Sequence, residues 1–308
     1  MPRVVVLGSS GFDLTIHLPR LPKPGETLLG GHLRSGPGGK GANQAIAARR
    51  AGAEVVFLTA FGDDDFGRCA AENCRSEGID LTYAKFVPAM PNQVALIFVG
   101  EDGANLIGVA PGASAALSVE DVEALPQSLF ATGDVLLASL EIPVPTVTAA
   151  LRRARAAGMR TIVNPAPANR AAAAPELLVL VDVLTPNEEE AAALAESLAQ
   201  GVDGARESAH ALRRSGARDV IVTLGEQGCL VVTEHEECRI AAPLVQVVDT
   251  VGAGDAFSGA LAVALAEGRP LIEAADWACA AGAFAVTQPG AQGALPTRAQ
   301  IDRLVARD

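Results

Sequence analysis

The sequence has few basic residues, no closely paired cysteines and no long apolar run. Aspartates and glutamates number 36 against 24 lysines and arginines, which gives a formal net charge of −12. This balance argues against the broad basic surface of a nucleic-acid or anionic-membrane binder, and we expect neither partner. It leaves a local phosphate site open, because backbone amides carry no formal charge.

The five cysteines are odd in number and form no C-x-x-C motif, which argues against a disulfide framework or a metal site. We expect reduced and mostly buried thiols. No apolar stretch approaches the length of a membrane span, and the run that follows Met1 is too short for a signal peptide. The sequence therefore predicts a soluble, cytoplasmic protein.

Continuous apolar runs alternate with alanine-rich stretches of helical spacing along most of the 308 residues. The expected strands are residues 4–8, 54–59, 134–139, 160–164, 182–186 and 219–225. The expected helices are residues 42–52, 144–158, 187–199 and 205–216. This alternation predicts one large α/β domain with a parallel sheet that is covered on both faces.

Two segments, residues 14–37 and 81–110, carry short extended runs without a helix signal. They predict a small separate sheet, and a sheet that lies over a cleft would act as a lid. Ordinary hairpins at a sheet edge are the alternative. The predicted division is a main domain of residues 1–13, 38–80 and 111–308, with residues 14–37 and 81–110 as the lid.

The stretch "VVDTVGAGDAFSGAL" (residues 247–261) predicts a change from strand to helix. Residues 244–248 are expected to form a short buried strand, and apolar residues recur at helical spacing after Asp255. Between them, Gly252-Ala253-Gly254 would let backbone amides approach an anion at a helix N-terminus. The alternative is that Asp255 only caps the helix and the glycines only make the turn.

A second glycine motif, "GPGGKGANQA" (residues 36–45), satisfies G-x-G-x-x-G but follows a polar loop instead of the first strand. Lys40 is followed by Gly41 and not by Ser or Thr. The motif is therefore neither a convincing dinucleotide fingerprint nor a Walker A loop. Lys40 and Asn43 could instead hold hydroxyls or a phosphate at a helix start.

Two further motifs each permit two interpretations. Asn187 and Glu190 form a capping box, or a polar pair that holds hydrated Mg²⁺ beside a triphosphate. "TLGEQG" (residues 223–228) forms a hairpin, or a bed for a nucleotide.

Taken in order along the chain, these motifs resemble the ribokinase (PfkB-type) carbohydrate kinase family, and its ribokinase branch in particular. The resemblance covers essentially the whole chain and rests on "GGKGANQA", "GDD", "NPAP", "TPNE", "TLGEQG" and "DTVGAGDAFSGAL". It implies a three-layer α/β/α sandwich with a mostly parallel central sheet and a small β-sheet lid. It also implies an ATP-dependent kinase of the 5-hydroxyl of a pentose, ribose first. The alternatives are 2-deoxyribose, another small sugar, a nucleoside, or a catalytically silent sugar-binding regulator.

The resemblance also assigns roles to individual residues. Asp255 would take the proton of the sugar hydroxyl, and the amides of Gly252, Ala253 and Gly254 would form an anion hole. A carboxylate at a helix N-terminus is expected to have a low pKa. The sugar would contact Asp13, Gly39, Lys40, Asn43 and Glu141. ATP would lie along Asn187, Thr223, Gly225 and Gly228.

Two metal ions and a second copy of the chain complete the implied machinery. Mg²⁺ would be held through water near Asn187 and Glu190. A monovalent cation, K⁺, would lie against Asp249, the Val251 carbonyl and carbonyls between Ala285 and Gly290. The lid would pair with that of a second copy to give a homodimer.

Two departures from the family's pattern fall in the sugar pocket. Gly11 stands where ribokinases carry an asparagine that holds sugar hydroxyls, and Asn92-Gln93 stand where they usually carry a Thr-Gly pair. Because Gly11 has no side chain to leave unpaired, we expect a smaller penalty against 2-deoxyribose. The vacated volume could also admit water or a larger substrate.

Overall fold

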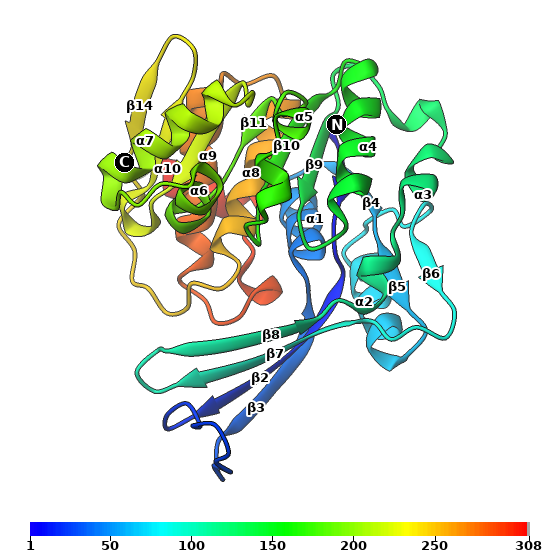
Figure 1. Cartoon of the computed structure of the whole chain (residues 1–308), viewed down its shortest axis with the longest axis vertical. Helices are drawn as coiled ribbons and strands as arrows, with labels where there is room; N and C mark the ends of the chain where they lie inside the picture. Colours follow the sequence, from blue (N-terminus) through cyan, green and yellow to red (C-terminus); the bar gives the residue numbers. More distant parts are fainter. Residues whose placement is uncertain (307–308) are drawn as a thin grey trace.

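The computed structural model describes residues 1–306, and an eight-stranded sheet forms its centre (Figure 1). Its strand order is β14-β13-β12-β11-β10-β9-β1-β4. The strands are β1 (Arg3–Leu7), β4 (Glu54–Leu58), β9 (Val135–Ser139), β10 (Arg160–Asn164), β11 (Val183–Leu184), β12 (Asp219–Thr223), β13 (Cys229–Val232) and β14 (Glu237–Ile240). All neighbours from β4 to β12 pair in parallel, and β13 and β14 add an antiparallel edge. The predicted, mostly parallel sheet is confirmed.

Helices cover both faces of this sheet, because alternate residues of each strand are apolar on opposite sides. Val4 and Val6 of β1 join one core cluster, and Val5 and Leu7 join the other. The first cluster contains α1 (Lys40–Arg50), α2 (Asp65–Ser76), α8 (Ala253–Ala266), α9 (Leu271–Ala285) and α10 (Arg298–Val305). The second contains α3 (Val119–Glu123), α4 (Val144–Ala156), α5 (Pro175–Leu178), α6 (Glu188–Ala195) and α7 (Gly201–Arg214). The result is the expected three-layer sandwich.

The predicted strand at residues 244–248 is wrong. The chain between β14 and α8 has no regular structure there, and Leu244 is fully exposed. The run is rich in β-branched residues, but a strand also needs a partner edge. Val248 makes a backbone hydrogen bond outside any strand, donating its amide to the Val286 carbonyl at 2.7 Å. The helix predicted after Asp255 is present as α8.

A four-stranded sheet of order β3-β2-β7-β8 projects from the α/β sandwich (Figure 1). Its strands are β2 (Gly11–Leu18), β3 (His32–Gly38), β7 (Gln93–Gly100) and β8 (Asn105–Ala110). A further pair, β5 (Ala60–Gly62) and β6 (Lys85–Val87), forms a separate two-stranded sheet. Both segments that lack a helix signal thus supply strands of one small sheet, while its action as a lid and the domain boundaries stay predictions.

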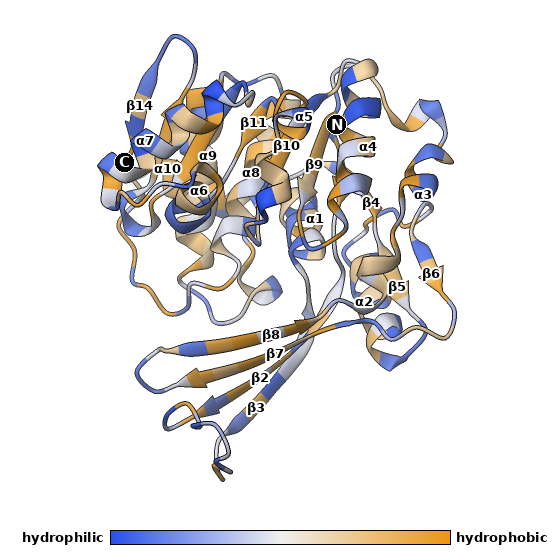
Figure 2. Ribbon diagram, in the orientation of Figure 1, coloured by the Kyte–Doolittle hydropathy of each residue, from blue (hydrophilic) through white to orange (hydrophobic). Residues whose placement is uncertain are grey.

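The register of the small sheet separates its side chains into two faces. Asp13 lies opposite Ala95, so the neighbouring residue Leu14, opposite Leu96, points to the other side. We call this other side the apolar lid face. Its members are Leu14, Ile16, Leu33, Leu96, Phe98 and Leu106. Figure 2 shows the strong hydrophobic colouring of β7 and β8, and Leu33, Leu96 and Leu106 are each at least half exposed.

Helices α1 and α8 approach each other closely, because Gly259 has no side chain. A Cβ at Gly259 would lie 2.5 Å from the Cβ of Ala47 and 2.8 Å from the Gln44 carbonyl oxygen. Only glycine fits without displacing α1. This contact brings the first turns of the two helices together, and the candidate site lies there.

All five cysteines are free thiols, and Cys74, Cys229 and Cys279 are buried, in agreement with the sequence prediction. Among residues 1–306, no helix combines the length and the apolar composition needed to cross a membrane.

Candidate active site

The carboxylate of Asp255 is buried in the first turn of α8 and is only 7% exposed. It accepts hydrogen bonds from Asn43 Nδ2 at 2.8 Å and from Gln44 Nε2 at 3.0 Å, both on α1. These two amides are held in turn, because Gln292 Nε2 donates to Asn43 Oδ1 and Gln44 Nε2 also reaches Asn164 Oδ1. Side chains from several distant segments therefore fix the orientation of this carboxylate.

The expectation of a low pKa for Asp255 is wrong. Burial raises the pKa of this carboxyl above its ordinary value, although Lys40, Asn43 and Gln44 act in the opposite direction. The favourable effect of a helix N-terminus is about 0.3–1 kcal/mol for exposed groups, and desolvation of a fully buried carboxylate exceeds it. A raised pKa makes Asp255 a better proton acceptor than the sequence suggested.

The backbone before Asp255 presents amides to a solvent-facing turn. Gly252 has a φ of 81°, which only glycine adopts without strain, and it directly precedes α8. The Ala253 amide donates to the Thr250 carbonyl at 3.3 Å. Within the described residues, the amides of Gly254 and Asp255 have no acceptor, and a Cβ at Gly254 would meet nothing within 4 Å. An anion can therefore approach these two amides.

Glu141 follows β9 and faces the same corner from the other side of α1. Its Oε2 accepts hydrogen bonds from the Lys40 amide at 3.0 Å, from Gln93 Nε2 at 3.2 Å and from the Ser9 hydroxyl. Gly39 precedes α1 with a φ of 88°, and a Cβ there would lie 2.6 Å from the Gly11 amide nitrogen. Sequence reasoning missed Ser9, Gln44, Asn164 and Gln292, because their neighbours lie far away in the chain.

The charged residues of this corner interact electrostatically with one another. Burial raises the pKa of Asp13 to about 6, and Glu141 and Asp255 act in the same direction. Burial would lower the pKa of Lys40, but Asp255, Glu141, Glu190 and Asp13 together raise it. The ammonium group of Lys40 thus interacts electrostatically with all four carboxylates. The structure brings together Asp13, Lys40, Asn43, Glu141 and Asp255, which come from four separate segments of the sequence.

A cavity of about 580 Å³ opens onto the start of α8. Thr223, Gly225 and Gly228 line one side, and Ala253 and Gly254 line the end nearest Asp255. Apolar residues, among them Phe257, Cys279, Ala283 and Val286, form another part of the lining. This lining suits a base packed against the apolar groups and phosphates at the start of α8. The 223–228 turn is a hairpin between β12 and β13, so both interpretations of this motif fit.

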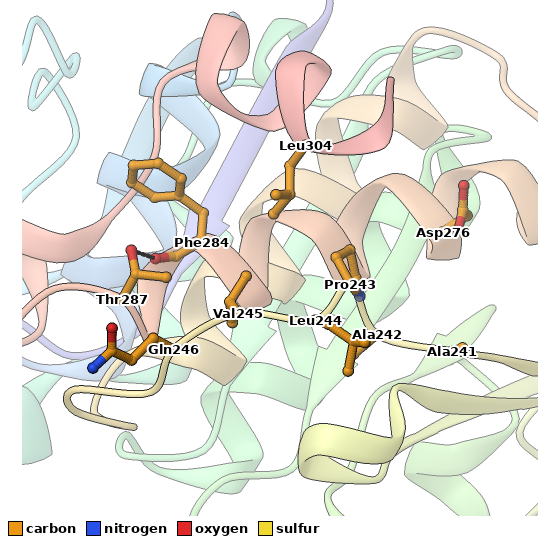
Figure 3. A pocket seen from close by; sticks show the side chains of 10 residues that line it. All are labelled: Ala241, Ala242, Pro243, Leu244, Val245, Gln246, Asp276, Phe284, Thr287 and Leu304. Carbon is orange, nitrogen blue, oxygen red and sulfur yellow. Dashed lines mark hydrogen bonds between the residues drawn. The ribbon is translucent and has the colours of Figure 1, made fainter. Parts of the chain in front are cut away.

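A second cavity, of about 850 Å³, lies behind the 241–246 segment and shares Ala242, Pro243, Leu244 and Val245 with the first (Figure 3). Phe284, Thr287 and Leu304 form its far wall. None of the predicted site residues lines it. The smaller cavity is therefore the better candidate for the nucleotide.

Asn187 and Glu190 form the capping box that the sequence allows. Asn187 Oδ1 accepts from the Glu190 amide at 2.7 Å, and Glu190 Oε2 accepts from the Asn187 amide at 2.9 Å. Oε1 of Glu190 has no donor in the described part of the chain, and Lys40 lies near enough to lower the pKa that burial raises. A carboxylate oxygen without a donor is a ligand type that fits hydrated Mg²⁺. Asn187 joins Thr223 through an isolated β-bridge.

The segments predicted to hold a monovalent cation lie against each other. The Asp249 amide donates to the Val286 carbonyl at 3.2 Å, and Asp249 Oδ2 accepts from the Gly290 amide at 2.8 Å. Asp249 Oδ1 accepts from the Val251 amide at 3.0 Å. The carbonyls between Ala285 and Gly290 therefore lie in the same loop cluster as Asp249, and Ala294 nearby is buried and offers no side-chain oxygen.

The side chain of Gln93 borders the space above Gly11. Gly11 and Gln93 are opposite each other in the β2–β7 register. A Cβ at Gly11 would lie 3.3 Å from Gln93 Nε2 and 3.4 Å from its Cγ. A side chain at residue 11 would therefore contact Gln93.

Comparison with known proteins identifies the family to which this chain belongs. The model of the pfkB family of carbohydrate kinases matches residues 1–298. The chain belongs to this family. The ribokinase of Haemophilus influenzae is 38% identical over 295 residues, which cover 96% of this chain and 95% of that protein. A deoxyribokinase of Salmonella typhi is 36% identical over 307 residues, which cover 98% of each chain.

A solved structure agrees with the fold of this pfkB-family chain. The structure of Arabidopsis thaliana ribokinase, which is complexed with ribose and ATP, has a TM-score of 0.86 and 29% identity. The match covers 99% of this chain and 98% of the Arabidopsis thaliana chain. The sequence-based assignment to the PfkB-type carbohydrate kinases is thereby confirmed.

We predict that Asp255→Asn lowers kcat by about 10²- to 10⁴-fold, the usual contribution of a positioned general base. The amide keeps the shape of the buried group, so thermal unfolding and ATP binding should change little. Stopped assays and calorimetric titration with ATP measure the two effects. Asp65→Asn, at an exposed position of α2, is the matched control. A variant that kept more than about half of the wild-type kcat would rule out this role.

We predict that Asp13 makes the folding stability depend on pH. Its folded-state pKa is about 6 against an ordinary value of 3.8, so the folded protein binds the proton more tightly. Folding stability should therefore fall as pH rises from about 4 to above 6, by at most about 3 kcal/mol. Asp13→Asn should raise the Tm at neutral pH, flatten this dependence and abolish sugar binding. An unchanged pH dependence of Tm in this variant would contradict the assignment.

Proposed function

We propose that this chain is an ATP-dependent kinase that transfers the γ-phosphate of ATP to the 5-hydroxyl of a pentose, with ribose as the first candidate. One observation carries the proposal: the cavity lined by the 223–228 hairpin ends at Ala253 and Gly254, beside the buried Asp255 carboxylate. The relatives named ribokinase and the ribose- and ATP-bound structure support the same reaction.

The chemistry follows from the arrangement of these groups. The 5-oxygen of the sugar attacks the γ-phosphorus, and the bond to the oxygen that bridges the β- and γ-phosphates breaks. The hydroxyl proton passes to the Asp255 carboxylate. The amides of Gly254 and Asp255 stabilise the charge on the transferring group, and Lys40 supplies a nearby positive charge. Asp13, Gly39, Asn43 and Glu141 hold the sugar.

Two ions complete the proposal. Mg²⁺, held through water by Asn187 and Glu190, neutralises phosphate charge when it is bound. Asp249, the Val251 carbonyl and the carbonyls between Ala285 and Gly290 would hold K⁺ behind the anion hole. We place the enzyme in the cytoplasm, since the thiols are free and the reaction consumes ATP.

A nucleoside is the second candidate substrate. A third cavity, of about 310 Å³, adjoins Glu141 and Gln93 and is lined mainly by apolar groups such as Val109, Leu140 and Ile142. Such a cavity beside the sugar could receive a base. A silent sugar-binding regulator is disfavoured, because Asp255 and its amide donors are all in place.

The sugar is tested by kcat/KM across ribose, 2-deoxyribose, hexoses and nucleosides, with ATP and Mg²⁺. We expect ribose to lead, with a preference over 2-deoxyribose of at most about a thousandfold, since few hydrogen bonds distinguish them. A nucleoside that exceeded ribose tenfold would favour the second candidate. Absence of phosphate transfer to every compound would reject the kinase proposal.

We predict a homodimer through the apolar lid face, because an exposed sheet with one apolar face gains stability when a symmetric copy covers it. Light scattering at micromolar concentration should give about twice the chain mass of 31.4 kDa. Leu96→Glu combined with Leu106→Glu should shift the protein to the monomer. Leu198→Glu, at an exposed position away from the lid, should not. A wild-type monomer would contradict the prediction.

We predict that K⁺ activates the enzyme by no more than about tenfold over tetramethylammonium. The physical reason is that Ala294, which follows the proposed cation loop, is buried and offers no side-chain oxygen. Ala294→Ser should therefore increase the activation. The measurement is the initial rate at matched ionic strength. Indifference to K⁺ in both proteins would show that the loop holds no functional cation.

A further inference from the structure

Gln93 links the small sheet to the sugar site. It is the first residue of β7, where the chain enters the small sheet, and it is only 3% exposed. Its Nε2 donates to Glu141 Oε2 at 3.2 Å. Gly11 lies opposite it, and the absence of a side chain there gives Gln93 its room.

The contact with Gln93 bears on how Glu141 is oriented. Three donors converge on one oxygen, Oε2, and within the described residues Oε1 accepts no hydrogen bond. The other two donors, Ser9 and the Lys40 amide, lie in the segments before β2 and at the start of α1. Gln93 is the donor from the small sheet. Saturation of Oε2 leaves Oε1 as the oxygen that can accept a sugar hydroxyl.

The carbonyl oxygen of the Gln93 side chain is itself unpaired. It is buried and has no hydrogen-bond partner among residues 1–306. The amide cannot simply be reversed, because its oxygen would then face the Glu141 carboxylate. Buried acceptors without a partner are rare in folded proteins, and a hydroxyl group is a suitable donor.

We propose that Gln93 helps to bind and position the sugar substrate of this kinase. It positions Glu141 toward the ring hydroxyls of the sugar, and its own carbonyl oxygen accepts a hydrogen bond from one of them. This inference rests on the proposed sugar-kinase function.

The first test is Gln93→Met, which keeps the length of the side chain and removes both polar atoms. We expect the KM for ribose to rise by about 10- to 100-fold, the effect of losing a hydrogen bond to a charged group together with a neutral one. The kcat should stay within about threefold, and the KM for ATP should not change, because Asp255 and the nucleotide cavity are untouched. Gln200→Met, at an exposed position without a side-chain capping bond, is the matched control.

The second test is Gln93→Glu. Its effect on kcat/KM should depend on pH, which a purely structural role of Gln93 would not predict. At about pH 8 two carboxylates would face each other and repel, whereas at about pH 5.5 a shared proton restores the donor to Glu141. The ratio of variant to wild-type kcat/KM for ribose should rise about tenfold or more on acidification. Gln93→Met adds no charge, so its ratio controls for the titration of Asp13. The same ratio for Gln93→Met should stay flat.

The outcomes separate this inference from the proposed function. A wild-type enzyme that phosphorylates ribose, with an unchanged KM in Gln93→Met or a flat pH ratio in Gln93→Glu, overturns the role of Gln93 alone. A wild-type protein that phosphorylates no sugar overturns both. Thermal unfolding of each variant shows whether it folds. If Gln93→Met does not fold, the Gln93→Glu variant still tests the role of Gln93.

Discussion

The close contact between α1 and α8 is the constraint on which the candidate site depends. Gly259 permits that contact, and the contact buries the Asp255 carboxylate against Asn43 and Gln44. A buried carboxylate is costly unless donors replace its water, and the two amides and the Lys40 charge do so. The same packing places the N-terminus of α8 beside the cavity of about 580 Å³. The buried carboxylate and the free amides are thus held by one helix–helix contact.

The other site residues meet there because of the sheet topology. In a parallel sheet the carboxyl ends of the strands share an edge, so the segments after β9, β10 and β12 contribute Glu141, Asn164 and the 223–228 hairpin to one region. Gathering several carboxylates around Lys40 opposes stability, as the raised pKa of Asp13 indicates. A chain selected only for stability would not keep this cluster. It is better understood as a site prepared for a polar ligand.

The sequence predicted what short-range patterns control and missed what distant contacts control. Apolar periodicity correctly indicated β1, β4, β9, β10, β11 and β12, because buried parallel strands leave continuous apolar runs. The strand expected at residues 244–248 failed, since no neighbouring edge is available to that run. The pKa of Asp255 was predicted in the wrong direction, because the helix N-terminus is visible in the sequence and the burial by α1 is not.

Gly11 and Gln93 show the same limit at the sugar pocket. From the sequence they are two separate departures from the ribokinase pattern, and Gly11 suggests an empty volume. The β2–β7 register places them opposite each other, so the side chain missing from one strand makes room for the longer one on the other. If Gln93 binds the sugar as we propose, the polar group has moved from β2 to β7 and is not lost. A Cβ at residue 11 would lie 3.3 Å from Gln93 Nε2, so the effect of a substitution there depends on the side chain of the facing strand.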